Sequence, residues 1–344
     1  MPVSWRDLRG IIAVLILAVA LCAGFGTSAS YGSATRPAHR GQPTIIPPGQ
    51  YQSDLAAAVH ADVTASVRLP SGSDLWVFGD TSQVNGNNMV GGFAHDSMAT
   101  ESAASFTMVP GHYGYQDTAG HQWQQVPDFS STQFFWAEGV FLTGSTVWVP
   151  GVRADGSGTV YDAEMAEFNA TTLAYEGVTQ LPGTEIWGSS IATSTGHWLI
   201  GTRKQSSTDC DSFATDCFAG DVAWVPNGDE TNESKWTITT DAFPASLNAG
   251  AIISPVAVSG GYRAYTKQGD QFGGTEIEEL SAPSITGPWT LTGRTWPTTY
   301  PSGATTYDVQ VHPEEYQGSD LLVSYAVNDY PSGQYDPNFF DLAP

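Results

Sequence analysis

Apolar and polar residues alternate with a period of two through most of this 344-residue chain, which is the pattern of half-buried β-strands. Within this pattern one phrase occurs five times: an apolar strand, a short turn that contains Gly, and a second apolar strand. The second strands begin at Leu75, Val147, His197, Tyr262 and Leu321, so the copies recur every 50 to 72 residues. A hairpin that repeats at this spacing predicts one hairpin per blade of a β-propeller.

Two further apolar segments follow the second, third and fourth hairpins. They read DAEMAEF and TTLAYEGVT, then DVAWVPN and KWTITTD, then TEIEELSA and GPWTLTG. The sequence therefore predicts an all-β, five-bladed propeller with four-stranded antiparallel blades. The chain after Ala326 can form only one more strand, so we expect residues 44–52 to supply the missing strand and close the ring. No window of 11 residues shows a convincing helical period.

The N-terminal segment differs in composition from the rest of the chain. Basic residues precede an apolar run from Ile11 to Cys22, and small residues follow, which predicts a secretory signal peptide over residues 1–29. An uncleaved membrane anchor is the alternative, although the run is shorter than the ~20 residues that span a bilayer. The Pro- and Gly-rich residues 30–50 predict a linker, and residues 51–344 the propeller domain.

The cysteine content and the net charge indicate which metals, cofactors and macromolecules this chain is expected to bind. Cys210 and Cys217 remain after signal removal, and in an exported protein we expect them to form a disulfide. They lack the CxxC spacing or clustered His of a metal site, so we expect no metal and no cofactor. The chain has 12 basic and 35 acidic residues, which disfavours nucleic acid and anionic membranes. A monomer that acts on a neutral polysaccharide fits this balance.

Antiparallel pairing brings the start of each inner strand and the end of the next strand to one face of a propeller. Asp62 opens the first inner strand, Asp80 ends the apolar strand LWVFG, and Glu138 interrupts the apolar stretch FFWAEGVF. Glycoside hydrolysis needs one protonated carboxyl as acid and one ionised carboxylate. Neighbouring carboxylates separate each other's pKa values into these two roles. Asp62, Asp80 and Glu138 are therefore the candidate catalytic residues; turn caps are the alternative for the two Asp.

Further residues at this face are candidates for substrate binding. With 11 Trp and 14 Tyr, the chain is rich in flat side chains that stack on sugars, and we expect Trp136 or Trp187 to form a wall of the pit. The other candidates are His312, Lys267 and Asp308. The alternatives are that the Trp side chains belong to the core, that His312 is structural, and that Lys267 pairs with an inner carboxylate.

The segment ADVTASVRLPSGSDLWVFGDTS, which ends in FGDT after an Asp-bearing first strand, resembles the opening blade of a family of exported bacterial propellers. HPEEYQGSDLLVSYAVN and YDPNFF are similar to its closing blade. This family, formerly domain of unknown function 4185, is glycoside hydrolase family 183, endo-D-arabinanases that cut the D-arabinan of mycobacterial cell walls. The resemblance places Asp62 and Asp80 at the family's acidic pair. SITGPWTL is similar to outer-strand motifs of five-bladed L-arabinanases and xylosidases, which use an Asp base, an Asp modulator and a Glu acid.

Two other functions fit the same residues. The propeller could be a non-catalytic carbohydrate-binding or surface scaffold protein, in which the carboxylates only satisfy buried polar groups. It could also be an enzyme for another glycan, such as an L-arabinan or a xylan. Released oligosaccharides from purified protein and a panel of arabinans would distinguish the three.

Overall fold

The structure is a computed structural model, and it describes residues 48–102, 105–204, 218–268, 274–317, 320–329 and 334–342. The elements below belong to the compact unit Ala38–Pro344. The predicted signal peptide, most of the predicted linker, and both Cys210 and Cys217 lie outside the described residues. Within this part of the chain, no helix is long and apolar enough to cross a membrane.

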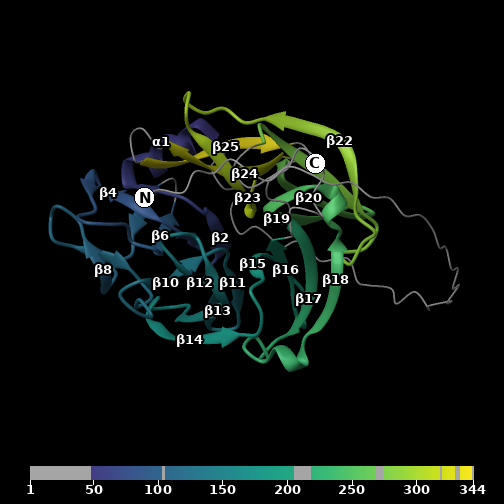
Figure 1. Cartoon of the computed structure of the whole chain (residues 1–344), viewed down its shortest axis with the longest axis horizontal. Helices are drawn as coiled ribbons and strands as arrows, with labels where there is room; N and C mark the ends of the chain where they lie inside the picture. The colour runs from purple at the N-terminus through teal and green to yellow at the C-terminus, as the bar shows by residue number, and fades with distance from the viewer. Residues whose placement is uncertain are drawn as a thin grey trace, which may run out of the picture. The chain divides into compact units, whose positions relative to one another are not determined.

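The five predicted hairpins are present, and each is part of an antiparallel sheet (Figure 1). The first sheet has the order β2-β3-β6-β7, formed by β2 (Ala65–Arg68), β3 (Asp74–Phe78), β6 (Ser97–Ser102) and β7 (Ser105–Met108). The second is formed by β10 (Gln133–Ala137), β11 (Phe141–Thr143), β12 (Thr146–Asp155), β13 (Val160–Asn169) and β14 (Tyr175–Leu181). Both β10 and β11 pair with β12, so together they form one interrupted inner strand.

The next two hairpins lie in one eight-stranded sheet, whose halves are joined by the single pair Phe218↔Ala249. One half is β15 (Ile186–Ala192), β16 (Gly196–Lys204), β17 (Phe218–Pro226) and β18 (Thr237–Phe243). The other is β19 (Ala249–Val258), β20 (Gly261–Gln268), β21 (Glu276–Ala282) and β22 (Thr290–Pro297). Two short 3-10 helices, η1 (Glu233–Lys235) and η2 (Ala245–Leu247), flank β18. The last sheet has three strands: β23 (Thr305–Gln317), β24 (Asp320–Asp329) and β25 (Gln334–Leu342).

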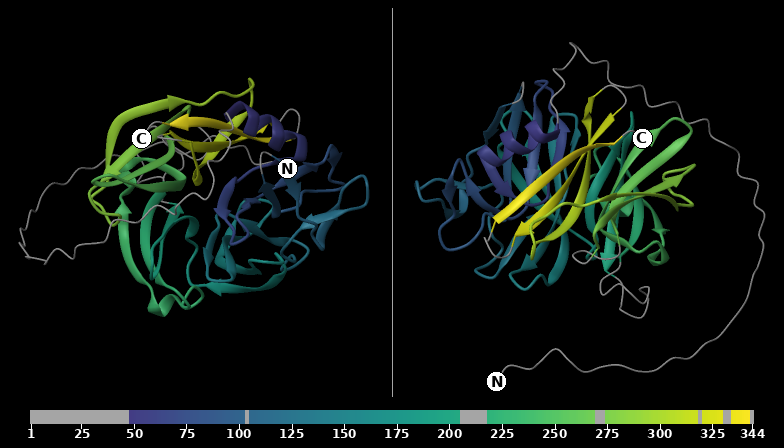
Figure 2. Two further views of the ribbon diagram at one scale, coloured as in Figure 1. Left: turned by 180° about the vertical axis from the view of Figure 1, so that it is seen from behind. Right: turned by 90° about the horizontal axis from the view of Figure 1, so that it is seen from above.

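A helix takes the place where the sequence predicted a closing strand. Helix α1 (Pro48–Ala58) begins with residues 48–52, which we expected to form a strand and in part a linker. The helix lies beside β25 (Figure 2). Tyr51, Leu55 and Ala58 are buried on one helical face, and the Tyr51 ring lies 5.9 Å from that of Phe339 in β25. The prediction was wrong because a short helix can cover this sheet with only three buried residues, too few for a clear period.

The core is divided among neighbouring sheets. One apolar cluster lies between the first two sheets, and others lie between each following pair of neighbours in turn. A further cluster joins Trp76 and Phe78 of β3 to Leu322 of β24 and Phe339 of β25, with Tyr51 among them. The first and last sheets are thus also neighbours.

The first strands of the five hairpins line one small cavity of about 40 Å³. Its lining comes from β2, the β10–β11 connection, β15, β19 and β23, and includes Ser66, Val140, Ser189, Ser254 and Gln310. Residues that are far apart in sequence therefore converge on this point, as the hairpin pattern predicts.

Two small sheets extend the first one. β1 (Val59–Ala61), β4 (Thr81–Val84) and β5 (Asn87–Asn88) form one, and the hairpin β8 (Tyr113–Gln116) with β9 (Gln122–Gln124) forms the other. The strand β1 precedes Asp62 and β4 follows Asp80, so this extension begins at the two predicted catalytic residues.

Candidate active site

Asp62 and Asp80 lie side by side because the backbone ladder of β2 and β3 continues beyond both strands. The Asp62 amide donates to the Asp80 carbonyl at 3.1 Å, and the Gly79 amide donates to the Asp62 carbonyl at 2.9 Å. The hairpin pattern predicted this adjacency. Val63, next to Asp62, has a φ of 43°, a strained conformation for a β-branched residue that is found most often at functional sites.

The Asp80 carboxylate is buried and accepts from two side chains. Trp136 Nε1 donates to Asp80 Oδ1 at 2.7 Å, and His95 Nδ1 lies 2.8 Å from the same oxygen. The His95 ring is stacked on Phe134, with centroids 3.5 Å apart and planes at 9°. Trp136 itself is half-buried, so its indole can both orient Asp80 and face a ligand. This oxygen is therefore fixed in direction before any substrate arrives.

Asp62 differs from Asp80 in its surroundings. The Tyr307 hydroxyl donates to Asp62 Oδ2 at 2.8 Å. Burial raises the pKa of Asp62 well above its ordinary value, and the negative charges of Asp80 and Asp308 raise it further. Asp62 is thus the carboxyl of this pair that is suited to hold a proton.

Glu138 reaches the same place from a β-bulge. The strand β10 ends at Ala137, and the amides of Glu138 and Gly139 both donate to the Pro150 carbonyl, at 3.0 and 3.3 Å. Two residues opposite one residue form a bulge, which redirects a side chain. Burial raises the pKa of Glu138, followed by the charges of Asp308, Asp62 and Asp80.

Asp308 completes the group from the last sheet. It is buried and left-handed, with a φ of 48°, where the register of β23 on β24 shifts between Tyr307 and Gln310. Its charge raises the pKa of both Asp62 and Glu138. The site therefore holds four interacting carboxyl groups from three sheets: Asp62, Asp80, Glu138 and Asp308. Such a group separates into protonated and ionised members, which acid and base catalysis requires.

Two predicted binding residues, Trp187 and His312, lie elsewhere. Trp187 is 1% exposed and packs edge-to-face on Trp236 in the core, so it forms no wall of this site. His312 is fully buried between Ser66 and Ser324, at 2.5 and 2.8 Å, and burial lowers its pKa to about 3. These corrections share one reason: residue type and strand position do not reveal which way a side chain points across neighbouring sheets.

Lys267 lies buried beside the site. It is 1% exposed, and its Nζ donates to the Thr306 carbonyl at 2.8 Å, two residues before Asp308. It supports the backbone that leads to Asp308, and its contact with a substrate stays a prediction. Glu185, two residues before Trp187, raises the pKa of Asp221 and Glu233 and is not among the charges that shift the pKa of Asp62 or Glu138.

Sequence reasoning missed His95 and Tyr307. His95 lies in the connection between β5 and β6, where no strand pattern indicates its direction. Tyr307 directly precedes the candidate Asp308, but aromatic residues in strands are ordinarily core. Only the tertiary contacts show that both contact the catalytic candidates.

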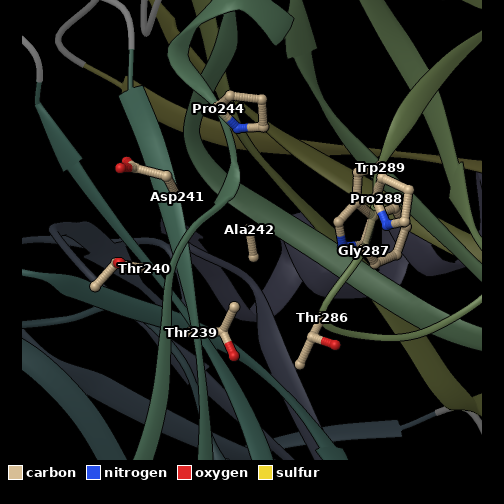
Figure 3. A pocket seen from close by; sticks show the side chains of 9 residues that line it. All are labelled: Thr239, Thr240, Asp241, Ala242, Pro244, Thr286, Gly287, Pro288 and Trp289. Carbon is tan, nitrogen blue, oxygen red and sulfur yellow. The ribbon is translucent and has the colours of Figure 1, made fainter. Parts of the chain in front are cut away.

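A larger cavity of about 410 Å³ lies apart from these carboxyl groups (Figure 3). It is lined by β18 and the β21–β22 connection, with Asp241 and Pro244 on one side and Gly287 and Trp289 on the other. None of the candidate catalytic residues lines it, so its size does not make it the active site.

The fold is that of solved glycoside hydrolases of the propeller class. The chain superposes on a candidate hydrolase from Bacteroides ovatus with a TM-score of 0.62, 12% identity and coverage of 85% of this chain and 88% of that one. It superposes on an endo-arabinase from Bacteroides thetaiotaomicron with a TM-score of 0.54, 12% identity and coverage of 83% and 95%. For the family 43 enzyme of Xanthomonas citri complexed with xylose, the values are 0.56, 14%, 87% and 94%.

The chain belongs to the family described as "Domain of unknown function (DUF5005)", which matches residues 50–342. None of the curated proteins matches the sequence. The match begins at the third residue of α1.

Proposed function

We propose that this protein is a secreted glycoside hydrolase that cleaves arabinofuranosyl linkages inside a polysaccharide. The observation that carries the proposal is the group of four interacting carboxyls, with Asp62 and Asp80 held side by side. Asp80, fixed by Trp136 and His95, is the nucleophile or base. Asp62, whose pKa is raised by burial, is the general acid, and Glu138 is the alternative acid.

D-Arabinan of the mycobacterial type is the substrate we propose. The opening-blade and closing-blade motifs support it through their resemblance to glycoside hydrolase family 183, and the fold likeness to an endo-arabinase supports an arabinan in general. The acidic balance of the chain and the acidic site fit a neutral polymer. The half-buried indole of Trp136 supplies a flat face for a sugar ring.

We propose further that the sheets are the blades of a five-bladed propeller. The shared cavity and the apolar cluster between the first and last sheets support this architecture. Secretion rests on the sequence of residues 1–29. It is tested by expressing the full chain in a secreting host and sequencing the N-terminus of the protein in the medium.

The function is tested by incubating purified residues 30–344 with mycobacterial arabinogalactan, sugar-beet L-arabinan and xylan. We expect a series of D-arabinose oligosaccharides from the first polymer and none from the others. If oligosaccharides are released only from L-arabinan or only from xylan, that polysaccharide replaces D-arabinan as the proposed substrate. Binding without release of any sugar, measured by co-sedimentation, would replace the enzyme with a carbohydrate-binding propeller.

A further inference from the structure

Gln310 is a buried amide that links the bulge of Glu138 to three other inner strands. It lies in β23 and is 3% exposed. Its Nε2 donates to the Glu138 carbonyl and to the Gly188 carbonyl, both at 3.1 Å. Its Oε1 accepts from Ser254 Oγ of β19 at 3.4 Å. Both amide hydrogens are therefore used on the backbone of the second and third hairpins.

Glycines make room for this link. A Cβ on Gly139 would lie 2.7 Å from the Gly188 carbonyl oxygen, and a Cβ on Gly188 would lie 2.2 Å from Cδ1 of Ile252. The bulge thus lies directly against β15, with no side chain between the two backbones. A carbonyl in such a tight contact needs a donor, because an unsatisfied buried carbonyl is costly. Gln310 supplies that donor to both strands at once.

The position of Gln310 in its own strand gives this link a consequence for the site. Asp308, two residues earlier in β23, faces Glu138, and Gln310 fixes the backbone of Glu138. The segment of β23 from Asp308 to Gln310 therefore does two things. Asp308 supplies a carboxyl group next to Glu138, and Gln310 fixes the backbone that carries the Glu138 side chain. We propose that Gln310 is a positioning residue that holds Glu138 in register with Asp308, Asp62 and Asp80; its catalytic consequence rests on the proposed function.

Two readouts test this proposal, one of them independent of activity. Gln310→Met keeps the length of the side chain and removes both donors. The Glu138 side-chain carboxyl is titrated by ¹³C NMR, with its signal assigned by its loss in Glu138→Gln. We expect the Glu138 titration to move to lower pH in Gln310→Met, because the bulge relaxes away from the other three carboxyls. We expect kcat to fall by roughly 10- to 100-fold, the cost of a displaced catalytic geometry, with KM changed less than about threefold.

Ser324→Ala is the matched control. It removes one buried hydrogen bond, to His312, from the same sheet without touching Glu138. It should leave the Glu138 titration and kcat at wild-type values. Should Gln310→Met fail to fold, Ser254→Ala removes the hydroxyl that orients the amide and that also accepts from the Val311 backbone amide at 3.0 Å. It should give a smaller shift of the same sign.

An unchanged Glu138 titration in a folded Gln310→Met protein would overturn the proposal, and so would an equal loss of kcat in Ser324→Ala. If the wild-type protein releases no sugar from any glycan, the proposed function fails. The NMR titration would still decide whether Gln310 sets the position of Glu138.

Discussion

The residues around Asp62 and Asp80 give these two neighbouring carboxyl groups different roles in the proposed catalysis. Asp80 accepts two side-chain hydrogen bonds at one oxygen. Asp62 accepts from the Tyr307 hydroxyl and from the Asp80 backbone, and its pKa is raised by burial and by its acidic neighbours. The backbone ladder fixes the spacing of the pair, so their chemical difference comes from the side chains around them. The roles of Asp80 and Asp62 can therefore be tested separately by substitution.

Asp80→Asn and Asp62→Asn should each lower kcat by at least the ~10²–10⁴-fold expected for a positioned proton-transfer group. Both variants should fold, since Asn keeps the size of the side chain and tolerates the same turn. Initial rates of oligosaccharide release, with circular dichroism as the folding check, measure this. Near-native rates from both folded variants would transfer the roles to Glu138 and Asp308.

Tyr307→Phe tests the acid role of Asp62. The Tyr307 hydroxyl stabilises the ionised form of Asp62, so its removal raises the pKa of Asp62 further. Since an acid works only while protonated, the alkaline limb of the kcat/KM profile should move to higher pH. A profile measured from pH 4 to 9 checks the direction. A shift to lower pH would contradict this assignment.

At the scale of elements, the site depends on irregular strands. Glu138 and Asp308 both enter it at points where the register of an antiparallel pair is broken, at the β10–β11 interruption and within β23. A regular strand would send alternate side chains to the core and leave these carboxyls elsewhere. The bulge at Glu138 also needs glycine at the next residue because of its contact with Gly188.

Gly139→Ala should therefore destabilise the fold and lower activity together. Its Cβ would lie 2.7 Å from a backbone carbonyl, which cannot move cheaply. We expect a loss of roughly 1–3 kcal/mol in the free energy of unfolding, typical of overpacking, measured by urea titration. Gly177→Ala in β14 is the control, since nothing lies within 4 Å of its added Cβ. Equal stability of the two variants would contradict the tight contact.

For the whole molecule, the contact between the first and last sheets is the decisive one. Helix α1 covers this junction, and Tyr51 contributes both a ring to the apolar cluster and a hydroxyl that donates to Glu315 Oε2 at 2.5 Å. Asp74, Glu101 and Glu315 stand together there, with carboxylate oxygens within 4.8 Å of one another. The junction between the first and last sheets thus contains both a buried apolar cluster and three neighbouring carboxyl groups.

Tyr51→Ala should cost roughly 3–5 kcal/mol in the free energy of unfolding, as for other large aromatic truncations. Tyr51→Phe keeps the ring and loses only the hydrogen bond, so its cost should be closer to 1 kcal/mol. Guanidinium unfolding of both variants measures the difference. A Tyr51→Ala protein as stable as Tyr51→Phe would show that α1 does not secure the junction.

The acidic junction should also make the protein less stable at high pH. Burial, with Glu315 nearby, raises the pKa of Asp74 to about 10, and burial raises that of Glu314 to about 7. The folded state then holds protons that the unfolded state has released, so stability is full at low pH and is lost as pH rises through these values. His312, with its lowered pKa, weakens the fold only below about 6.5. Tm should therefore fall from pH 6.5 to 9, and Asp74→Asn should flatten this slope.

Sequence patterning predicted most strands because alternation and Gly turns are local signals. It also placed Asp62 beside Asp80, since hairpin pairing follows from adjacency in the chain. It missed α1, whose few buried positions give no period, and it misplaced Trp187 and His312, whose burial depends on the neighbouring sheet. His95 and the bulge that directs Glu138 are set by tertiary contacts, which no local pattern records.

The hydrogen bond between Trp136 and Asp80 also gives the site an optical reporter. An indole whose N–H donates to a carboxylate changes its emission when that carboxylate is protonated or covered by a ligand. Because Trp136 is half-buried at the candidate site, a fluorescence difference between the wild type and Trp136→Phe would isolate its signal from those of the other ten tryptophans. Ligand occupancy could then be followed in real time in Asp62→Asn, a variant that should bind without turnover.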